Sequence, residues 1–380
     1  MGRVKINPEA LKWARIDSGY TYSNLPNKIK SKFPEWESGN VMPTWNQLCD
    51  ISNYFKRPTA FFFRTRFPEH INMDLIEYRK LKDAQYVEKS PTLTIGIRES
   101  IYKREKFLKL LEDMHHSKNI FSRHALKTDN ATDLSNHMRD ILDVPLNEQK
   151  SWLHNNGRRD SLHYNFLNQW KDNISSKLGI LIFEIPRVSL EEMRAICIYY
   201  DEHPIILLNS ADSPNARIFS LFHELTHLLF GESAICDVKS DNSKEWFCNS
   251  VAGEFLIPKN DLKNNPLVKC SDGKWTDEKI LRLSHEYGVS KETIFLRLIS
   301  IKKAEQEDYI QMKEKWMLNR KRSVFQGGSP VLNQMKYNGR LYTSVMLSAY
   351  ENGIISSVEF SQNIGLRLKH IDELYEKLYG

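Results

Sequence analysis

Apolar positions in the first part of the chain recur three and four residues apart, which is the spacing of short amphipathic helices. Residues 8–18 form one such stretch, and a second short helix is expected around residues 22–30. Thr44 stands where a helix N-cap is needed, directly before a further apolar stretch at residues 45–54. We therefore predict a small helical domain over residues 1–66.

The pattern changes along the rest of the chain. Residues 67–170 combine a linker with helical spacing. Short β-type runs follow at 180–183, 195–200 and 205–208, and then two apolar helices at 216–230 and 246–256. These elements predict an α+β unit with a small sheet over residues 171–262.

The remaining residues, 263–380, show helical spacing again. Residues 277–301 have a helix–turn–helix pattern with Ser290 as N-cap. We favour a structural helical hairpin over a second DNA-binding motif for this segment. Two or three more helices are expected after residue 327. The fold class predicted for the whole chain is α+β and mostly α.

The run His223-Glu224-Leu225-Thr226-His227 carries the strongest chemical signal. Histidines four residues apart lie on one helical face, where two imidazoles are able to hold one zinc ion. The glutamate between them is placed to deprotonate a water on that metal. Because the flanking residues are apolar, polar side chains here need a common partner, which a metal provides. We predict a Zn²⁺ site at His223 and His227 with Glu224 as catalytic base.

A catalytic zinc needs a third protein ligand and an open position. Glu245 begins the following helix and Glu254 lies near its end. Their separation corresponds to about 900° of helical rotation, so they face opposite ways and only one reaches the metal. Glu245 is favoured, because Asn249 lies one turn later on its face and is placed to orient a ligating histidine. Zinc is the default metal for this donor set, and manganese or iron also fit it.

The charge distribution and the cysteines limit which binding partners and which cellular compartment are expected. Residues 1–66 hold 11 Lys or Arg against 5 Asp or Glu, so the whole net charge of +6 lies there. Such an excess suits an anion such as nucleic acid, and a merely solvated basic face explains it nearly as well. Five scattered cysteines favour reduced thiols in the cytoplasm. Cys236 and Cys248 are candidate metal ligands, but a small semi-buried role is favoured for both.

The runs at 219–229 and 245–258 together resemble the ImmA/IrrE family of zinc metallopeptidases. In that family a Glu-x-x-x-Asn helix with a hydrophobic-Pro stop follows the zinc helix. Cys248 stands where the family usually has Ala, and Thr226 replaces a common Gly or Ala. The tail, at 327–329 and 353–356, is similar to longer members associated with phages and mobile elements.

The resemblance implies a zincin-like fold, a small twisted sheet packed on two metal-bearing helices. It also implies attack on a peptide carbonyl by zinc-bound water, with Glu224 as general base and then proton donor. Tyr199, Tyr200 and His203 are candidates for a second oxyanion donor, although a core or edge-strand role is favoured for each.

Residues 1–66 resemble the phage-repressor-like (Xre-type) helix-turn-helix domain, in which one helix enters the major groove. The expected recognition helix is shortened to about residues 29–36 and so presents few side chains to base edges. Lys28, Lys30 and Lys32 are candidates for contacts with phosphates. A degenerate domain that serves folding or docks a partner is the alternative.

The favoured function is a zinc-dependent endopeptidase that cleaves a regulatory protein, of repressor or antitoxin type as the resemblance implies. The alternative is a DNA- or protein-binding antitoxin or transcriptional regulator whose metal site is mainly structural. Glu224 favours the enzyme, because a scaffold needs no base between the histidines.

Overall fold

The computed structural model describes residues 2–68, 89–121, 130–153, 159–229, 242–271, 273–318 and 329–380. Three features named from the sequence lie outside these residues: most of the linker, Cys236, and residues 327–328 of the tail motif. No helix in the described part of the chain combines the length and the apolar character needed to cross a membrane.

The N-terminal domain consists of α1 (Pro8–Asp17), α2 (Asn27–Lys30), α3 (Phe33–Glu37), α4 (Trp45–Phe55) and the 3-10 helix η1 (Thr59–Phe63). The helices expected at 8–18 and 45–54 are confirmed. Thr44 caps α4 with a full capping box, in which its side chain and that of Gln47 satisfy each other's backbone N–H groups. The domain has a hydrophobic core of its own, separate from the two cores of the remaining chain.

The single helix expected at residues 29–36 is wrong. The chain forms α2 and α3 with a turn at Ser31 and Lys32 between them. Pro34 explains the break, because a proline lacks an N–H and its ring clashes with the carbonyl one turn earlier. Pro26 similarly delays the helix expected at 22–30, which begins only at Asn27.

A three-stranded sheet lies at the centre of the larger part. Strand β3 (Ile205–Asn209) is central, pairing parallel with β1 (Leu181–Ile185) and antiparallel with β2 (Ala195–Ile198). The three predicted strands are confirmed. All residues of β1 and β3 are buried, which agrees with a sheet covered on both faces.

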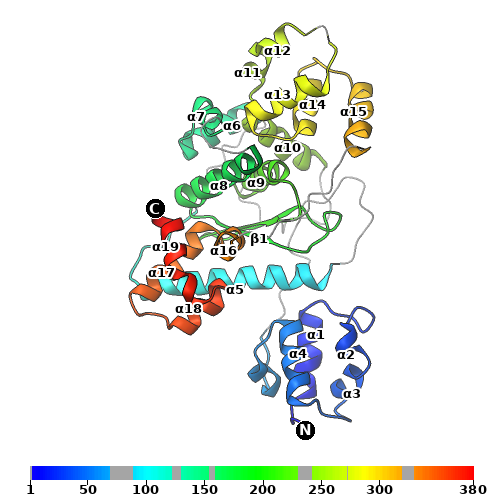
Figure 1. Cartoon of the computed structure of the whole chain (residues 1–380), viewed down its shortest axis with the longest axis vertical. Coiled ribbons are helices and arrows are strands. Elements are labelled where there is room, and N and C mark those ends of the chain that lie inside the picture. Colours follow the sequence, from blue (N-terminus) through cyan, green and yellow to red (C-terminus); the bar gives the residue numbers. More distant parts are fainter. Residues whose placement is uncertain are drawn as a thin grey trace.

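Helices cover both faces of this sheet (Figure 1). One face packs against α8 (Arg159–Leu178) and α9 (Pro214–Leu229), and the other against α5 (Pro91–Asp113) and α17 (Arg340–Glu351). Successive strand residues alternate between the two cores, as the pleat requires. On β1, for example, Ile182 belongs to the α9 side and Phe183 to the α5 side.

The remaining helices extend these two layers. They are α6 (Ala131–Leu142), α7 (Leu146–Ser151), α10 (Asn242–Leu256), α11 (Lys259–Asn264), α12 (Pro266–Lys269), α13 (Asp277–Tyr287), α14 (Lys291–Ser300), α15 (Gln306–Leu318), α16 (Pro330–Asn338), α18 (Ser357–Ile364), η3 (Leu368–His370) and α19 (Ile371–Tyr379). The hairpin of α13 and α14 is confirmed, with Ser290 as N-cap. The estimate of two or three helices in the tail is wrong, since α16, α17, α18 and α19 all form there.

The two cores combine segments from the predicted regions 67–170, 171–262 and 263–380. Trp170 belongs to one core together with residues of α9, α10 and α13, and residues of α5, β1 and α17 share the second core. The region that holds the sheet and α9 therefore shares its hydrophobic cores with the helices before and after it. The molecule is mostly helical, with this one small sheet.

An arginine clamp joins the N-terminal domain to the larger part. Arg98 on α5 donates to the Asp17 carboxylate at 2.7 Å, to the Ser18 hydroxyl at 3.0 Å and to the Phe55 carbonyl at 2.6 Å. The Arg98 side chain is only 9% exposed. Figure 1 shows the N-terminal domain beyond α5, on the far side of the sheet from α9.

Candidate metal centre

Helix α9 packs directly against one face of the sheet. The chain leaves β3 at Asn209, whose side-chain amide donates to the carbonyls of Val188 and Met193 at 3.0 and 2.8 Å. This fixes the turn from which α9 starts at Pro214. Helix α9 is buried along most of its length and packs against β2, β3, α8 and α10.

Two aromatic rings hold α9 and α10 together. Phe222 and Phe255 stack with their ring centroids 4.2 Å apart, and the Trp170 indole lies edge-on to both. Phe222 immediately precedes His223, so this contact sets the position of the first histidine relative to α10. Side chains from the two helices can therefore meet at one point.

Three donor groups converge between α9 and α10. The Nε2 atoms of His223 and His227 lie 3.1 Å apart. The Glu245 carboxylate on α10 places Oε2 3.3 Å from His223 Nε2 and Oε1 3.1 Å from His227 Nε2. The structure thus brings together the three ligands predicted from the sequence, and no second such group of three occurs among the residues it describes.

The spacing of these donors fits one tetrahedral cation. Ligand atoms about 2.0–2.1 Å from a zinc ion at tetrahedral angles lie about 3.3–3.4 Å from one another. The observed separations of 3.1–3.3 Å match three such edges. Two imidazoles and one carboxylate also form the donor set that leaves one position open for chemistry.

Burial differs among the ligands. The His223 side chain is 1% exposed, that of His227 is 18% exposed and that of Glu245 is 44% exposed. Solvent therefore reaches the three donors from the side of His227 and Glu245. Hydrogen bonds from His223 and His227 keep the pKa of Glu245 low although its partial burial works to raise it. Glu245 therefore stays an anion, as a cation ligand must.

Glu224 lies at the edge of this group. Its side chain is 3% exposed, and its Oε1 atom has no hydrogen-bond partner among the described residues. A buried carboxylate oxygen without a partner is costly, so an unpaired oxygen of this kind is a sign of a functional group. A water or a substrate N–H is the partner that a general base at this position would take.

Glu254 points away from the three donors. Its carboxylate forms an ion pair with Arg297 on α14 and accepts the Lys259 N–H at the start of α11. The choice of Glu245 over Glu254 thus agrees with the geometry. Glu254 is buried and joins α10 to α14.

The role predicted for Asn249 does not appear in the structure. Its side chain makes no hydrogen bond within the described residues, so it orients neither histidine. Cys248 takes the neighbouring position instead. It is 2% exposed and hydrogen-bonds to His227, one of the contacts that raise the pKa of that imidazole against the opposing effect of burial. Cys248 is not one of the three donors, and its burial agrees with the role favoured for it from the sequence. It lies three residues after Glu245 on the same helical face, a spacing that could have predicted its contact with His227.

The three candidate oxyanion donors are engaged elsewhere. The Tyr199 hydroxyl donates to Asp201 at 2.8 Å, and the Tyr200 ring lies 3.6 Å from the Arg104 guanidinium carbon. His203 binds the Gly179 carbonyl through Nδ1 at 2.7 Å and accepts the Asn119 N–H through Nε2. All three therefore have the structural roles that were favoured from the sequence.

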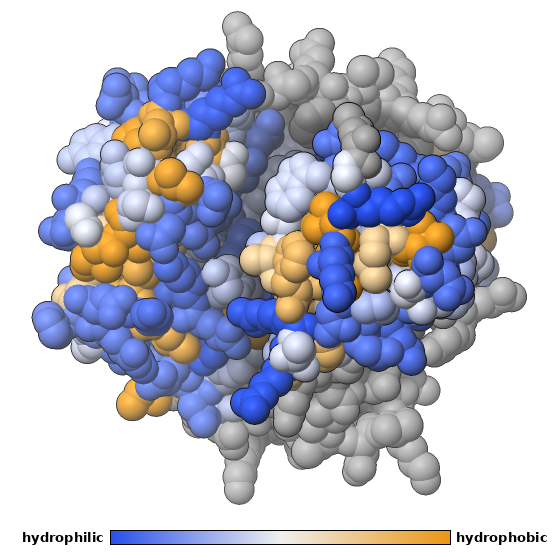
Figure 2. Space-filling view, turned by 90° about the horizontal axis from the view of Figure 1, so that it is seen from below, coloured by the Kyte–Doolittle hydropathy of each residue, from blue (hydrophilic) through white to orange (hydrophobic). Residues whose placement is uncertain are grey.

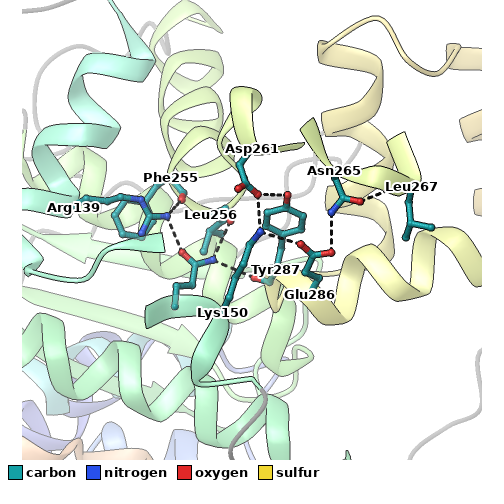
Figure 3. Close-up of polar contacts among 10 residues, drawn as sticks. Arg139, Lys150, Phe255, Leu256, Asp261, Asn265, Leu267, Glu286 and Tyr287 are labelled. Atoms are coloured by element: carbon teal, nitrogen blue, oxygen red, sulfur yellow. Dashed lines mark hydrogen bonds and ion pairs between the residues drawn. The ribbon is translucent and has the colours of Figure 1, made fainter. Parts of the chain in front are cut away.

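A polar network closes the far end of α10 (Figure 3). Arg139 on α6 donates to the Phe255 carbonyl, and Gln149 donates to the Leu256 carbonyl at 3.0 Å. These carbonyls end a helix and have no partner within it. Nearby, Lys150 bridges Asp261 and Glu286 at 2.7 and 2.9 Å. The network anchors α10, and with it Glu245, to α6, α7 and α13.

The three lysines predicted to contact DNA phosphates lie on the surface around α2. Lys28 forms an ion pair with Asp50 at 2.8 Å, and Lys30 donates to the Ser23 carbonyl at 2.5 Å. Lys32 is exposed and forms no ion pair within the described residues. Lys28 is therefore less available to an anion than the other two.

Residues 176–298 match the family model of the IrrE N-terminal-like domain, Peptidase_M78. The matched segment extends from the end of α8 to α14 and contains His223, Glu224, His227 and Glu245. This match supports the ImmA/IrrE family and a metallopeptidase for that part of the chain. No curated protein matches the chain.

Proposed function

We propose that this protein is a zinc-dependent endopeptidase with a zincin-like catalytic region, in which His223, His227 and Glu245 hold the metal. The observation that carries the proposal is the spacing of their donor atoms, 3.1–3.3 Å, beside the unpartnered oxygen of Glu224. The family match over residues 176–298 supports the same class of enzyme.

A bound zinc ion would supply a Lewis acid that makes water nucleophilic near neutral pH and polarises the scissile carbonyl. Glu224 accepts the proton of the attacking water at Oε1 and passes it to the departing amine nitrogen. Glu245 keeps a negative charge beside the two imidazoles and so fixes both rings. The apolar wall formed by α9 and the sheet excludes bulk water from the side of His223.

Metal content tests the site directly. Purified wild-type protein is expected to carry one equivalent of zinc by elemental analysis, and His223→Ala is expected to carry almost none. A zinc site with two remaining ligands loses most of its affinity. Glu254→Ala is the matched control, because it removes a buried carboxylate of α10 that lies outside the site. Stoichiometric zinc in His223→Ala, or none in the wild type, contradicts the proposal.

The substrate in this proposal is a regulatory protein of repressor or antitoxin type. The resemblance of residues 219–229 and 245–258 to the ImmA/IrrE family supports this choice. A half-exposed third ligand also suits a macromolecular substrate, since Glu245 lies 44% exposed at the edge of the site.

The N-terminal domain is proposed to bind nucleic acid through the phosphate backbone. It carries the whole net charge of the chain, and an open hollow on it is lined by Arg3 and Lys5. Figure 2, seen from the end that this domain occupies, shows hydrophilic residues over much of it with apolar ones between them. Because α2 and α3 are only 4 and 5 residues long, contacts with phosphates are favoured over reading of base edges.

Changing Lys30 and Lys32 to Glu is expected to abolish or strongly weaken the electrophoretic shift of a plain duplex at low salt. Loss of each phosphate contact should also reduce the slope of log K against log salt by about 0.9. The same changes at Lys315 and Lys369, which are exposed outside the N-terminal domain, alter the net charge equally and serve as control. A wild-type protein that shifts no duplex at any salt concentration disproves nucleic-acid binding.

A further inference from the structure

Three cations surround one carboxylate inside the fold, away from the metal centre. Glu184 on β1 contacts Lys171 of α8 at 2.9 Å, Arg217 of α9 at 2.5 Å and Lys336 of α16 at 3.8 Å. The side chains of Glu184, Arg217 and Lys171 are 0%, 1% and 5% exposed. Among these four side chains the positive charges exceed the negative by two. Buried charges are normally balanced by partners, so such an excess calls for an anion.

Arg217 has an unused hydrogen-bonding edge within this cluster. Its Nη1 atom donates to Glu184, whereas Nε and Nη2 are buried and have no hydrogen-bond partner among the residues that the structure describes. Those two atoms form the side of a guanidinium that donates two parallel hydrogen bonds to an oxyanion. Arg15 uses the same edge in this chain, where its Nε and Nη2 grip the Glu37 carboxylate at 2.9 and 3.0 Å.

The size of the charge excess points to the kind of anion. A phosphate monoester carries about −1.5 to −2 at pH 7, with oxygens that accept bidentate hydrogen bonds from arginine. This charge balances an excess of two, whereas a single carboxylate or a chloride ion would balance only half of it. The lysine ammonium groups offer further donors to the same oxygens.

The cluster meets the surface at Tyr164 and Lys336. The Tyr164 side chain of α8 is 45% exposed, and its ring lies 5.4 Å from the Arg217 guanidinium carbon and 6.0 Å from the Lys336 ammonium. The Lys336 side chain is 17% exposed. The exposed Tyr164 ring is therefore the side from which an anion would approach Arg217.

We propose that Arg217, Lys336 and Lys171 form a binding site for a phosphate group, supplied by inorganic phosphate or by a small phosphate monoester. The site is independent of the peptidase assignment. It lies at the start of α9, where Arg217 precedes His223 by less than two helical turns. A phosphate held there fastens α8, α9 and α16 around β1, the arrangement seen in Figure 1.

The test is the melting temperature of the full chain in sodium phosphate, compared with sodium chloride and sodium acetate at equal ionic strength and pH 7.5. Phosphate is expected to raise Tm by several degrees more than either monoanion, because it binds the folded state alone. Glycerol 3-phosphate and AMP, titrated in the same way, distinguish a site for free phosphate from a site for a monoester.

Lys336→Met is expected to weaken the apparent phosphate affinity by about tenfold or more, as loss of a charge-assisted contact predicts. Lys106→Met is the matched control: that lysine is 18% exposed and pairs with one carboxylate, Glu359. Its phosphate response should equal that of the wild type. Arg217→Met would remove the bidentate edge and should abolish the phosphate response. If Arg217→Met fails to fold, the response of Lys336→Met decides the test.

The rise in Tm with phosphate must also persist in His223→Ala. That variant lacks the metal site, so a persisting rise cannot come from phosphate bound to the metal. The proposal is overturned if phosphate stabilises no more than acetate or chloride. It is equally overturned if Lys336→Met keeps the wild-type response. Loss of the response in His223→Ala assigns it to the metal centre and likewise refutes the site, whatever the peptidase assays show.

Discussion

Glu224→Gln is expected to slow peptide hydrolysis by about 10²- to 10⁴-fold, which is the usual contribution of a general acid–base group. The amide keeps the size of the side chain but accepts no proton from water. Since Glu224 is not one of the three metal donors, the zinc content should remain at one equivalent. Single-turnover hydrolysis of a protein substrate, with elemental analysis of the same samples, measures both quantities.

Glu254→Gln provides the control for this substitution. Glu254 is 4% exposed against 3% for Glu224, so both changes neutralise an equally buried carboxylate. Glu254 pairs with Arg297, and its loss should lower stability while leaving the hydrolysis rate of the folded protein unchanged. Equal loss of rate in both variants would contradict a proton-transfer role for Glu224. If cells that carry Glu224→Gln behave like cells that carry the wild type, the alternative function is favoured, a regulator whose metal site is mainly structural.

Trp170→Ala is expected to lower the free energy of unfolding by about 3–5 kcal/mol, the range found when large buried aromatic side chains are truncated. Trp170 is fully buried, with ring centroids 4.9 Å from those of Trp152 and Phe222 and 5.4 Å from that of Phe255. The cavity would open beside the stacked pair that joins α9 to α10. Guanidinium-induced unfolding, followed by circular dichroism, measures the loss.

The control for this prediction is Trp45→Ala, the same truncation at a tryptophan that is 53% exposed. Its expected cost is below about 1 kcal/mol, because surface substitutions change stability little. Zinc affinity should fall in Trp170→Ala as well, since the distance between His223 and Glu245 depends on the packing of α9 against α10. Similar stabilities of the two variants would show that this aromatic cluster contributes little.

Local signals in the sequence predicted much of this structure. Thr44 marked the start of α4, and Ser290 marked that of α14, because capping depends on residues only three apart. The spacing of His223 and His227 likewise placed both imidazoles on one helical face. Such features need no knowledge of the rest of the chain.

Features that depend on distant residues could not be predicted. The preference of His227 for Cys248 over Asn249 depends on how α9 and α10 are rotated against each other, which the Phe222–Phe255 stack decides. The cluster around Glu184 draws its cations from three helices that are far apart in the sequence. The break between α2 and α3, by contrast, has a local cause, because Pro34 interrupts the hydrogen bonding of a continuous helix.

The arginine clamp on α5 bears on how the chain after residue 66 would behave without the N-terminal domain. If residues 1–66 were removed, Arg98 would lose the Asp17 carboxylate and the Phe55 carbonyl that now satisfy its guanidinium. The freed cation would then face water on α5, the helix that backs the central sheet. Removal of the N-terminal domain would therefore exchange these hydrogen bonds of Arg98 for hydrogen bonds with water, and the shortened chain would lose the stabilisation that they give to α5.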